Sequence, residues 1–298
     1  MLPRFTRRLA ALFVSCLWLT ASAAQITPAE YLGSYTWTWE TEGFGGFSGL
    51  EVSADGAGFT TISDRGALAT GRFRREAGRI AGIEEATLTR LGNTFGRVVD
   101  PFMADAEGLA IDGQGRIFIS FEGYHRVWTY PTLERAEWVP VAPAFEAIPN
   151  ENGGLEALAV DGQGRLHAIP ERSGQLTRPF PVYRLEGETW TQPFSIARSN
   201  GFLMVGADFD DEGRLYTLER GFSGFGFRSR VRRFTLEDDR IVQDDTLLIT
   251  HTLRHDNLEG LSVWRDAEGD IRLTMISDDN FQPIQRTEFV EYRVPEDS

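Results

Sequence analysis

The sequence predicts an all-β protein, a β-propeller of four-stranded blades, and three observations lead to this prediction. First, a pattern of strand, tight turn and strand recurs five times, with starts at residues 48, 107, 156, 205 and 259, which lie 49 to 59 residues apart. Second, further strand-like runs follow each hairpin, so each repeat holds about four strands. Third, no segment shows a helical period with paired caps. Four-stranded repeats of this length are typical of β-propellers.

The first 24 residues have the features of a secretory signal peptide. Arginines at positions 4, 7 and 8 precede a short apolar run, residues 9–20, and residues 21–23 (Ala-Ser-Ala) resemble a cleavage site. We therefore expect cleavage near residue 23 or 24 and secretion, into the periplasm. The apolar run is too short to span a bilayer, so no membrane insertion is expected. Residues 25–298 are expected to form one propeller domain and to be a monomer.

Composition excludes several classes of chemistry. The mature chain has no cysteine and no lysine, which removes thiolate catalysis, cysteine metal sites, Schiff-base chemistry and the phosphate-loop lysine. The formal charge is −14, and the signal peptide carries three arginines and no acid, so the mature chain stands at −17. This charge argues against nucleic acid and anionic membranes as partners.

The first predicted strand closes the ring. Residues 31–40, YLGSYTWTWE, alternate and are rich in aromatic side chains, as in a strand. The fifth repeat has room for only three strands before Ser298, so we expect residues 31–40 to supply its fourth, because an open sheet edge invites aggregation. This arrangement gives five blades. The alternative is six, with a further blade in the long interval between residues 48 and 107.

Two short strings recur in the hairpins. Glu-(Gly/Ala)-Leu-(Ala/Ser)-(Ile/Val) occurs at residues 107, 156 and 259, and Asp-x-x-Gly-Arg-(Ile/Leu) occurs at 112, 161 and 210. The second string supplies the residues that a tight turn needs. A four-residue turn, 112–115, would pair Ile111 with Arg116.

That register brings acidic residues together at the open end of each hairpin. It places Glu122 opposite Asp105, with Glu107 on the same face two residues along. The same reasoning places Glu171 opposite Gly154 beside Glu156, and Asn257 opposite Asp278 beside Glu259. Because the first strand of each blade lines the central channel of a propeller, we expect a ring of acids at one mouth. Its members would be Asp64, Glu122, Glu171, Glu219 and Asp278 from the second strands, and Glu107, Glu156 and Glu259 from the first strands.

Packed carboxylates repel one another unless they bind a cation, pair with arginine or hold protons. A hard, oxygen-preferring cation, Ca²⁺ first, suits acids accompanied by the amides of Asn152, Asn257 and Asn280. The alternative is purely structural, with acid–arginine pairs that tie neighbouring blades together.

At these residues the chain resembles the phytase-like proteins described as having esterase-like activity of phytase. The resemblance runs from about residue 47 to residue 290 and implies ester or phosphoester hydrolysis with calcium. The chain departs from the pattern at Gly153, where arginine is common, and at Val205, which replaces an acidic or serine position. The matching strings are Ser48-Gly49-Leu50, Ser63 to Gly66, Glu107-Gly108-Leu109, Glu122-Gly123, Asn152 to Ala157, Leu218-Glu219-Arg220, Asn257 to Leu261, Ser277 to Phe281 and Gln285-Arg286-Thr287.

The leading hypothesis is therefore a secreted, calcium-assisted hydrolase of a phosphate ester or a small ester. The predicted metal ligands are Glu107, Glu156, Asn257, Glu259 and Asp278. Asp64 or Glu171 would be the general base, and Arg65, Arg220 and Arg286 would meet the developing negative charge. Two alternatives stay open: a non-catalytic propeller that binds a ligand or a protein around a structural cation, and a lactonase.

Overall fold

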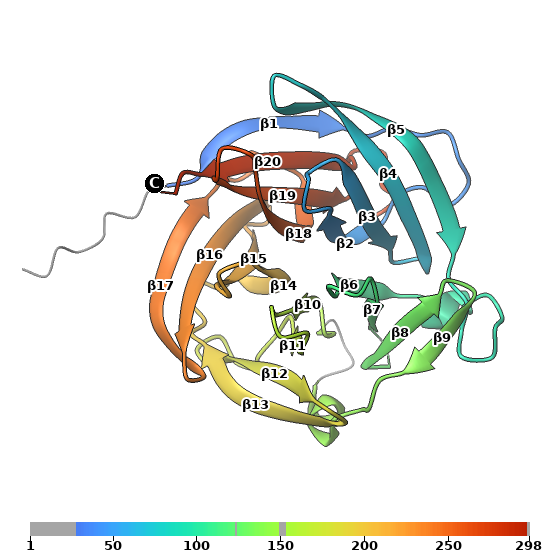
Figure 1. The fold of residues 1–298 in the computed structure, drawn as a ribbon, viewed down its shortest axis with the longest axis vertical. Helices are drawn as coiled ribbons and strands as arrows, with labels where there is room; N and C mark the ends of the chain where they lie inside the picture. Colours follow the sequence, from blue (N-terminus) through green and yellow to red (C-terminus); the bar gives the residue numbers. More distant parts are fainter. Residues whose placement is uncertain (1–27, 123, 149–152, 297–298) are drawn as a thin grey trace, which may run out of the picture.

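The computed structural model describes residues 28–122, 124–148 and 153–296 and forms a β-propeller of five blades around a central channel (Figure 1). The predicted signal peptide, Gly123 and Asn152 lie outside the described residues. Each blade is a four-stranded antiparallel sheet, so the prediction of five blades is confirmed. The interval between residues 48 and 107 holds no sixth blade within the described chain. It is long because β4 and β5 have 10 and 12 residues and residues 91–105 follow them as a connection.

The blades follow one another along the chain, and strands are numbered from the N-terminus. The first blade contains β2 (Phe47–Val52), β3 (Gly58–Ser63), β4 (Ala67–Glu76) and β5 (Arg79–Arg90). The second contains β6 (Ala106–Ile111), β7 (Ile117–Phe121), β8 (Arg126–Thr132) and β9 (Arg135–Trp138). The third contains β10 (Ala157–Val160), β11 (Leu166–Ile169), β12 (Phe180–Glu186) and β13 (Thr189–Ile196). The fourth contains β14 (Leu203–Phe209), β15 (Leu215–Phe222), β16 (Phe227–Glu237) and β17 (Arg240–Ile249). The fifth contains β18 (Asn257–Arg265), β19 (Ile271–Asp278), β20 (Glu288–Val294) and β1 (Glu30–Thr36).

Helical structure within the described ranges is limited to two 3₁₀ turns, η1 (Pro101–Met103) and η2 (Pro143–Ala147). No helix there reaches the length and apolarity needed to cross a bilayer.

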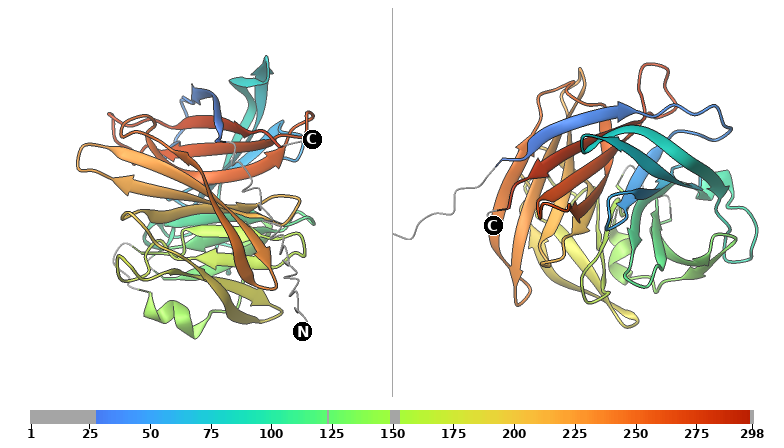
Figure 2. Two further views of the ribbon diagram at one scale, coloured as in Figure 1. Left: turned by 90° about the vertical axis from the view of Figure 1, so that its left-hand side faces the viewer. Right: turned by 45° about the horizontal axis from the view of Figure 1, so that its top comes forward.

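The N-terminal strand closes the ring as predicted, although it is shorter than residues 31–40. β1 pairs antiparallel with β20 as the outer strand of the fifth blade, and Tyr35 lies opposite Phe289 (Figure 2). Just beyond β1, the buried ring of Trp37 stacks on Phe47 of the first blade at 5.3 Å and lies 5.8 Å from Phe289. The aromatic-rich segment therefore joins the first and last blades in one apolar cluster.

The turns between the first two strands are one residue longer than predicted. Asp112 accepts hydrogen bonds at Oδ1 from the backbone N–H groups of Gln114 and Arg116, and at Oδ2 from Arg116 Nε (2.6 Å). This turn has five residues, so Ile111 pairs with Ile117 and not with Arg116. The same hydrogen bonds recur at Asp161 and Asp210.

A β-bulge near the channel mouth restores the predicted pairing of the acids. One extra residue in each innermost strand shifts the register by one, so the N–H of Glu122 donates to the carbonyl of Asp105, as predicted. Bulges at barrel and sheet rims re-aim side chains in this way. The extra residue is Ser48, Val205 or Glu259 in three blades, and it falls within residues 107–108 and 155–156 in the others.

The recurring Glu-Gly-Leu string now has a structural explanation. The glycine lets innermost strands approach closely: a Cβ on Gly206 would lie 2.7 Å from the carbonyl oxygen of Glu259, and one on Gly108 would lie 2.9 Å from that of Glu156. The next residue points into the channel and fills it, leaving a void of about 10 Å³, roughly the volume of one water. These filling residues are Leu50, Leu109, Leu158, Ala207 and Leu261.

Side chains farther down the channel satisfy the free edges of the innermost strands. Glu51 accepts the N–H of Ile111 in the next blade, and Asp208 accepts that of Val263 (2.6 Å). Ser262 does the same for Val52. Because unpaired edge N–H groups are costly when buried, these polar residues belong to the joints between blades.

Candidate functional site

A cavity of about 360 Å³ opens at the channel mouth where the innermost strands begin. The plug of channel-filling side chains forms its floor, so the cavity is closed on that side. Eight carboxyl groups and two guanidinium groups line it. The lining residues are Ser48, Asp64, Asp105, Glu107, Glu122, Glu156, Glu171, Arg172, Arg220, Glu259, Asp278 and Asn280.

Five lining residues occupy equivalent positions at the ends of the second strands. Each lies opposite the residue two positions before the bulge: Asp64 opposite residue 46, Glu122 opposite 105, Glu171 opposite 154, Arg220 opposite 203 and Asp278 opposite 257. The predicted ring is therefore present for four blades. In the fourth blade, arginine stands in the ring where Glu219 was predicted.

Glu219 lies away from the cavity, and its prediction as a ring member was wrong. It pairs with Met204, one step down the strand, so its side chain points to the opposite face of the sheet. There it is fully buried and forms ion pairs with Arg230 and Arg232. Both arginines lie on β16 of the same blade, so these pairs brace the fourth blade internally and do not tie it to a neighbour.

Arg220 neutralises one side of the cavity. Its guanidinium donates to Glu171 (2.9 Å) and forms an ion pair with Glu259, so it links the third and fifth blades. It also donates to Asn257 Oδ1 (3.1 Å), and Asn257 in turn donates to Glu259 (2.9 Å). Asn257 is buried behind Glu259 and does not line the cavity. Two predicted metal ligands are thus already engaged by an arginine.

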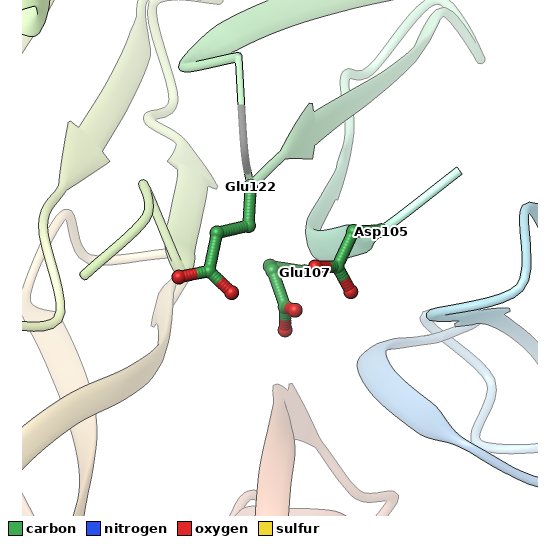
Figure 3. A group of neighbouring side chains, drawn as sticks. All are labelled: Asp105, Glu107 and Glu122. Carbon is green, nitrogen blue, oxygen red and sulfur yellow. The ribbon is translucent and has the colours of Figure 1, made fainter. Parts of the chain in front are cut away.

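The acids on the opposite side of the cavity form no ion pair with a described arginine, although the nearby charges of Arg126 and Arg65 oppose the rise in the pKa values of Asp105 and Asp64. Oxygen atoms of Asp105, Glu107 and Glu122 lie within 4.8 Å of one another, and Figure 3 shows their side chains converging on one space. Glu122 accepts a backbone hydrogen bond from Gly153 (2.9 Å). Oδ1 of Asp64 is buried and has no hydrogen-bond partner in the part of the chain that the structure describes. The cavity therefore has a neutralised side and a strongly acidic side.

Burial and mutual repulsion raise the pKa values of these acids. Burial, and then the negative charge of Asp105, raise the pKa of Asp64 to about 7. Burial and the charge of Glu259 raise the pKa of Asp278 to about 8. The pKa of Glu107 is raised well above its usual range by burial and by surrounding carboxylates, Glu156 foremost. Burial is the first cause of all three shifts, and the charges of neighbouring carboxylates add to it.

The acidic side meets the requirements of a hard divalent cation. Ca²⁺ takes six to eight oxygen ligands at about 2.3–2.6 Å, so two ligands of one ion lie at most about 5 Å apart. The 4.8 Å cluster satisfies that limit, and the buried, unpartnered oxygen of Asp64 is a further donor on the same wall. The donor set contains only oxygen, which favours calcium or magnesium over transition metals.

Two predicted arginines lie outside the lining. Arg65 is exposed at the rim, where its guanidinium stacks on the ring of Phe281 at 3.2 Å. Arg286 is half exposed and pairs with Glu288 (3.2 Å). Arg172, in contrast, lines the cavity and donates to Glu171 (2.7 Å), and the sequence reasoning missed it.

The other predicted site residues agree closely with the residues that line the cavity. Asp64, Glu107, Glu156, Glu171, Arg220, Glu259 and Asp278 all line the cavity, and their individual roles stay predictions. Asp105 and Glu122 were paired correctly but not proposed as ligands, although the register already placed them beside Glu107. Ser48 and Asn280 also line the cavity, and both lie within strings that the family resemblance marked.

Fold and site together define a five-bladed propeller with an acidic, cation-compatible cavity at one mouth. A family model described as "Phytase-like: Esterase-like activity of phytase" matches residues 42–281, and the chain belongs to this family. A comparison with curated proteins found no match.

Among solved structures, the chain is similar to regucalcin, a calcium-binding protein from Agrobacterium tumefaciens (TM-score 0.48, 9% identity, 91% of this chain and 98% of that one). It is also similar to the PQQ-bound aldose sugar dehydrogenase of Streptomyces coelicolor (TM-score 0.46, 14% identity, 90% and 100%). A third is a protein described as a putative gluconolactonase (TM-score 0.41, 13% identity, 91% and 96%).

Proposed function

We propose that this chain is a secreted, calcium-assisted hydrolase that cleaves an ester or a phosphate ester in the cavity at the channel mouth. One observation carries the proposal: eight carboxyl groups line the cavity at the channel mouth with only two arginines among the described lining residues, and three of the carboxyl groups converge on one space. A structural ring would resemble Glu219, with an arginine for each acid. Membership of the phytase-like family supports ester hydrolysis.

Asp105, Glu107 and Glu122 would hold the cation, and Glu156 lies near Glu107 in the same cavity. This revises the predicted ligand set, because Glu259 and Asn257 already bond to Arg220. When bound, the cation would polarise the ester oxygen and lower the pKa of a water beside it. It would also let a chain of charge −17 accept an anionic substrate.

The general base is assigned to Asp64. Both oxygens of Glu171 are engaged, one by Arg172 and one by Arg220, whereas Oδ1 of Asp64 is free to accept a hydrogen bond from water. A base must lie within hydrogen-bond reach of the proton that it removes, and Asp64 shares the cavity with the acidic cluster.

Arg172 and Arg220 are the cations placed to stabilise negative charge that develops on the substrate. They replace Arg65 and Arg286 in this role, since Arg286 pairs with Glu288 outside the lining and Arg65 lies at the rim.

The test is hydrolysis by the purified mature protein of 4-nitrophenyl phosphate, 4-nitrophenyl acetate and a simple lactone. Each is measured with calcium, with chelator, and with the Asp64→Asn variant. We expect turnover of at least one substrate, lost on chelation and reduced about a hundredfold or more in the variant, since general bases contribute roughly 10²–10⁴. Glu137→Gln, an exposed position on β9, is the matched control and should retain full activity.

The outcomes separate the alternatives. Turnover that survives chelation would contradict cation assistance. No turnover of any substrate, with calcium still raising the unfolding temperature, would indicate a non-catalytic propeller that binds a cation. Turnover of the lactone alone would assign the protein as a lactonase.

A further inference from the structure

A second pocket, of about 440 Å³, adjoins the cavity over the third blade. Arg172 lines both spaces and so forms the boundary between them. The walls include the apolar side chains of Ile148 and Tyr183 and three prolines, whereas Arg178 supplies a second guanidinium. We call this space the arginine pocket.

The pocket exists because the third blade opens at its mouth end. β11 and β12 pair through only two residue pairs, His167 with Arg184 and Ala168 with Tyr183. The equivalent strands of the fourth blade pair through eight. Proline cannot donate to a ladder, and Pro170, Pro179 and Pro181 lie where the pairing would continue. Residues 170–179 therefore leave the sheet and form one wall of the pocket.

The charges of this pocket are opposite to those of the cavity. None of the described residues that line the pocket carries a carboxyl group. Arg198 lies behind Arg172 and donates to Ser173 Oγ (3.3 Å) and to the carbonyl of Gln175 (3.2 Å), while its guanidinium stacks on Phe180 at 5.3 Å. Its Nε is buried without a hydrogen-bond partner among the described residues. Burial and then the nearby charge of Arg172 lower the pKa of Arg198, and the charge of Glu171 partly offsets them.

Two guanidinium groups, those of Arg172 and Arg178, therefore line the pocket, and that of Arg198 lies near Arg172. Arg172 pairs with Glu171, whereas no described carboxylate forms an ion pair with Arg178 or Arg198. Like charges held close together favour the binding of an opposite charge, and guanidinium groups suit carboxylate and phosphate oxygens. The apolar wall gives a short hydrocarbon segment a surface to pack against.

We infer that the arginine pocket binds a second, anionic group of the substrate, a carboxylate or a phosphate carried on a short apolar segment, while the scissile bond lies in the acidic cavity. This inference rests on the proposed function. It defines the substrate class as an ester that bears a negative charge away from the bond that is cleaved.

Anion binding is tested first without catalysis. Isothermal titration of chelator-treated protein with succinate and with inorganic phosphate keeps any bound cation from contributing. We expect at least one anion to bind, and Arg178→Gln and Arg198→Gln each to weaken it about tenfold or more, as for the loss of a charge-assisted hydrogen bond. The succinate and phosphate arms distinguish the two anions. Arg228→Gln is the matched control, because Arg228 also stacks on a phenylalanine, Phe202, but belongs to the fourth blade.

Kinetics provide the second arm. The ratio of kcat/KM for mono-4-nitrophenyl glutarate to that for the neutral 4-nitrophenyl pentanoate should fall about tenfold in Arg178→Gln, mainly through KM. Binding of neither anion, or binding unchanged in both arginine variants, would overturn the inference even if ester hydrolysis is found. If no ester is hydrolysed, the titrations still decide whether the pocket binds anions, so the two failures can be told apart.

Discussion

Replacing Glu107 by glutamine should have opposite effects on the protein without and with calcium. In the chelated protein Glu107 is buried among Asp105, Glu122, Glu156 and Glu259, and their charges raise its pKa. Glutamine keeps the shape of the side chain and removes the charge. The chelated variant should therefore be more stable than the parent protein, and its response to calcium should be smaller.

The magnitude follows from the spacing of the cluster. Two unit charges 4.8 Å apart at an effective dielectric constant of 20 repel by about 3 kcal/mol. Proton uptake relieves part of this repulsion, so we expect a gain of roughly 1–3 kcal/mol at pH 8 in chelator. Calcium at a hundred times its Kd would stabilise the parent by about 2.7 kcal/mol, and a hundredfold weaker Kd would leave about 0.4 kcal/mol.

The assay is urea denaturation at pH 8 with chelator and with calcium. The control is Glu219→Gln, also buried but paired with Arg230 and Arg232, which should lose about 3–5 kcal/mol in both conditions because it leaves buried cations uncompensated. If Glu107→Gln destabilises the chelated protein as the control does, the charge of Glu107 is already compensated within the protein. The proposed cation site would then be wrong. An unchanged calcium response in Glu107→Gln would be equally damaging.

Three further predictions concern stability. Arg220→Gln should destabilise the chelated protein by about 3–5 kcal/mol in urea denaturation, because it leaves Glu259 without its cation and Glu171 with Arg172 alone, and calcium should recover part of the loss; a neutral effect would contradict the ion pairs. Burial lowers the pKa of His167 to about 4 in the folded protein, whereas its pKa in the unfolded chain is about 6.5. As pH falls, His167 is therefore protonated in the unfolded chain before it is protonated in the folded protein. Stability should thus be lost between pH 6.5 and 4, by up to about 3 kcal/mol, and His167→Gln should lose less in denaturation at pH 7.5 and 4.5. Deleting residues 25–36 removes β1 and exposes the edge of β20, so light scattering should show aggregation below the parent unfolding temperature, and equal melting would argue against closure by β1.

The sequence was sufficient for the repeat, the blade number and the closing strand, because alternation and turn chemistry are local signals. The strand pairing predicted at the channel mouth was correct, although the pairing predicted next to the turn was wrong. The turn has five residues, since Asp112 bonds both Gln114 and Arg116, and the bulge near Glu107 offsets the extra residue. Neither feature is visible in hydrophobic alternation alone.

The sequence contained a signal that Glu219 is not the ring member of the fourth blade. Glu122 and Glu171 each lie six residues after the arginine that ends their turn, at 116 and 165. Six residues after Arg214 comes Arg220, so counting from the turn identifies the ring member of the fourth blade. The ion-pair partners of Arg220 could not be predicted from the sequence. Glu171 and Glu259 lie 49 and 39 residues away along the chain, and their contact with Arg220 depends on side-chain geometry.

A comparison of the five blades shows which residues at the bulge the fold requires. The first and fourth blades keep the glycine after the bulge, Gly49 and Gly206, but carry Ser48 and Val205 where other blades have glutamate. The blade and its bulge therefore form without an acid at this position. Burial and like charges raise the pKa of both Glu107 and Glu156, so these acids cost stability in the protein alone. Carboxylates that the architecture does not require, and that repel one another in the cavity at the channel mouth, are explained by a ligand of opposite charge.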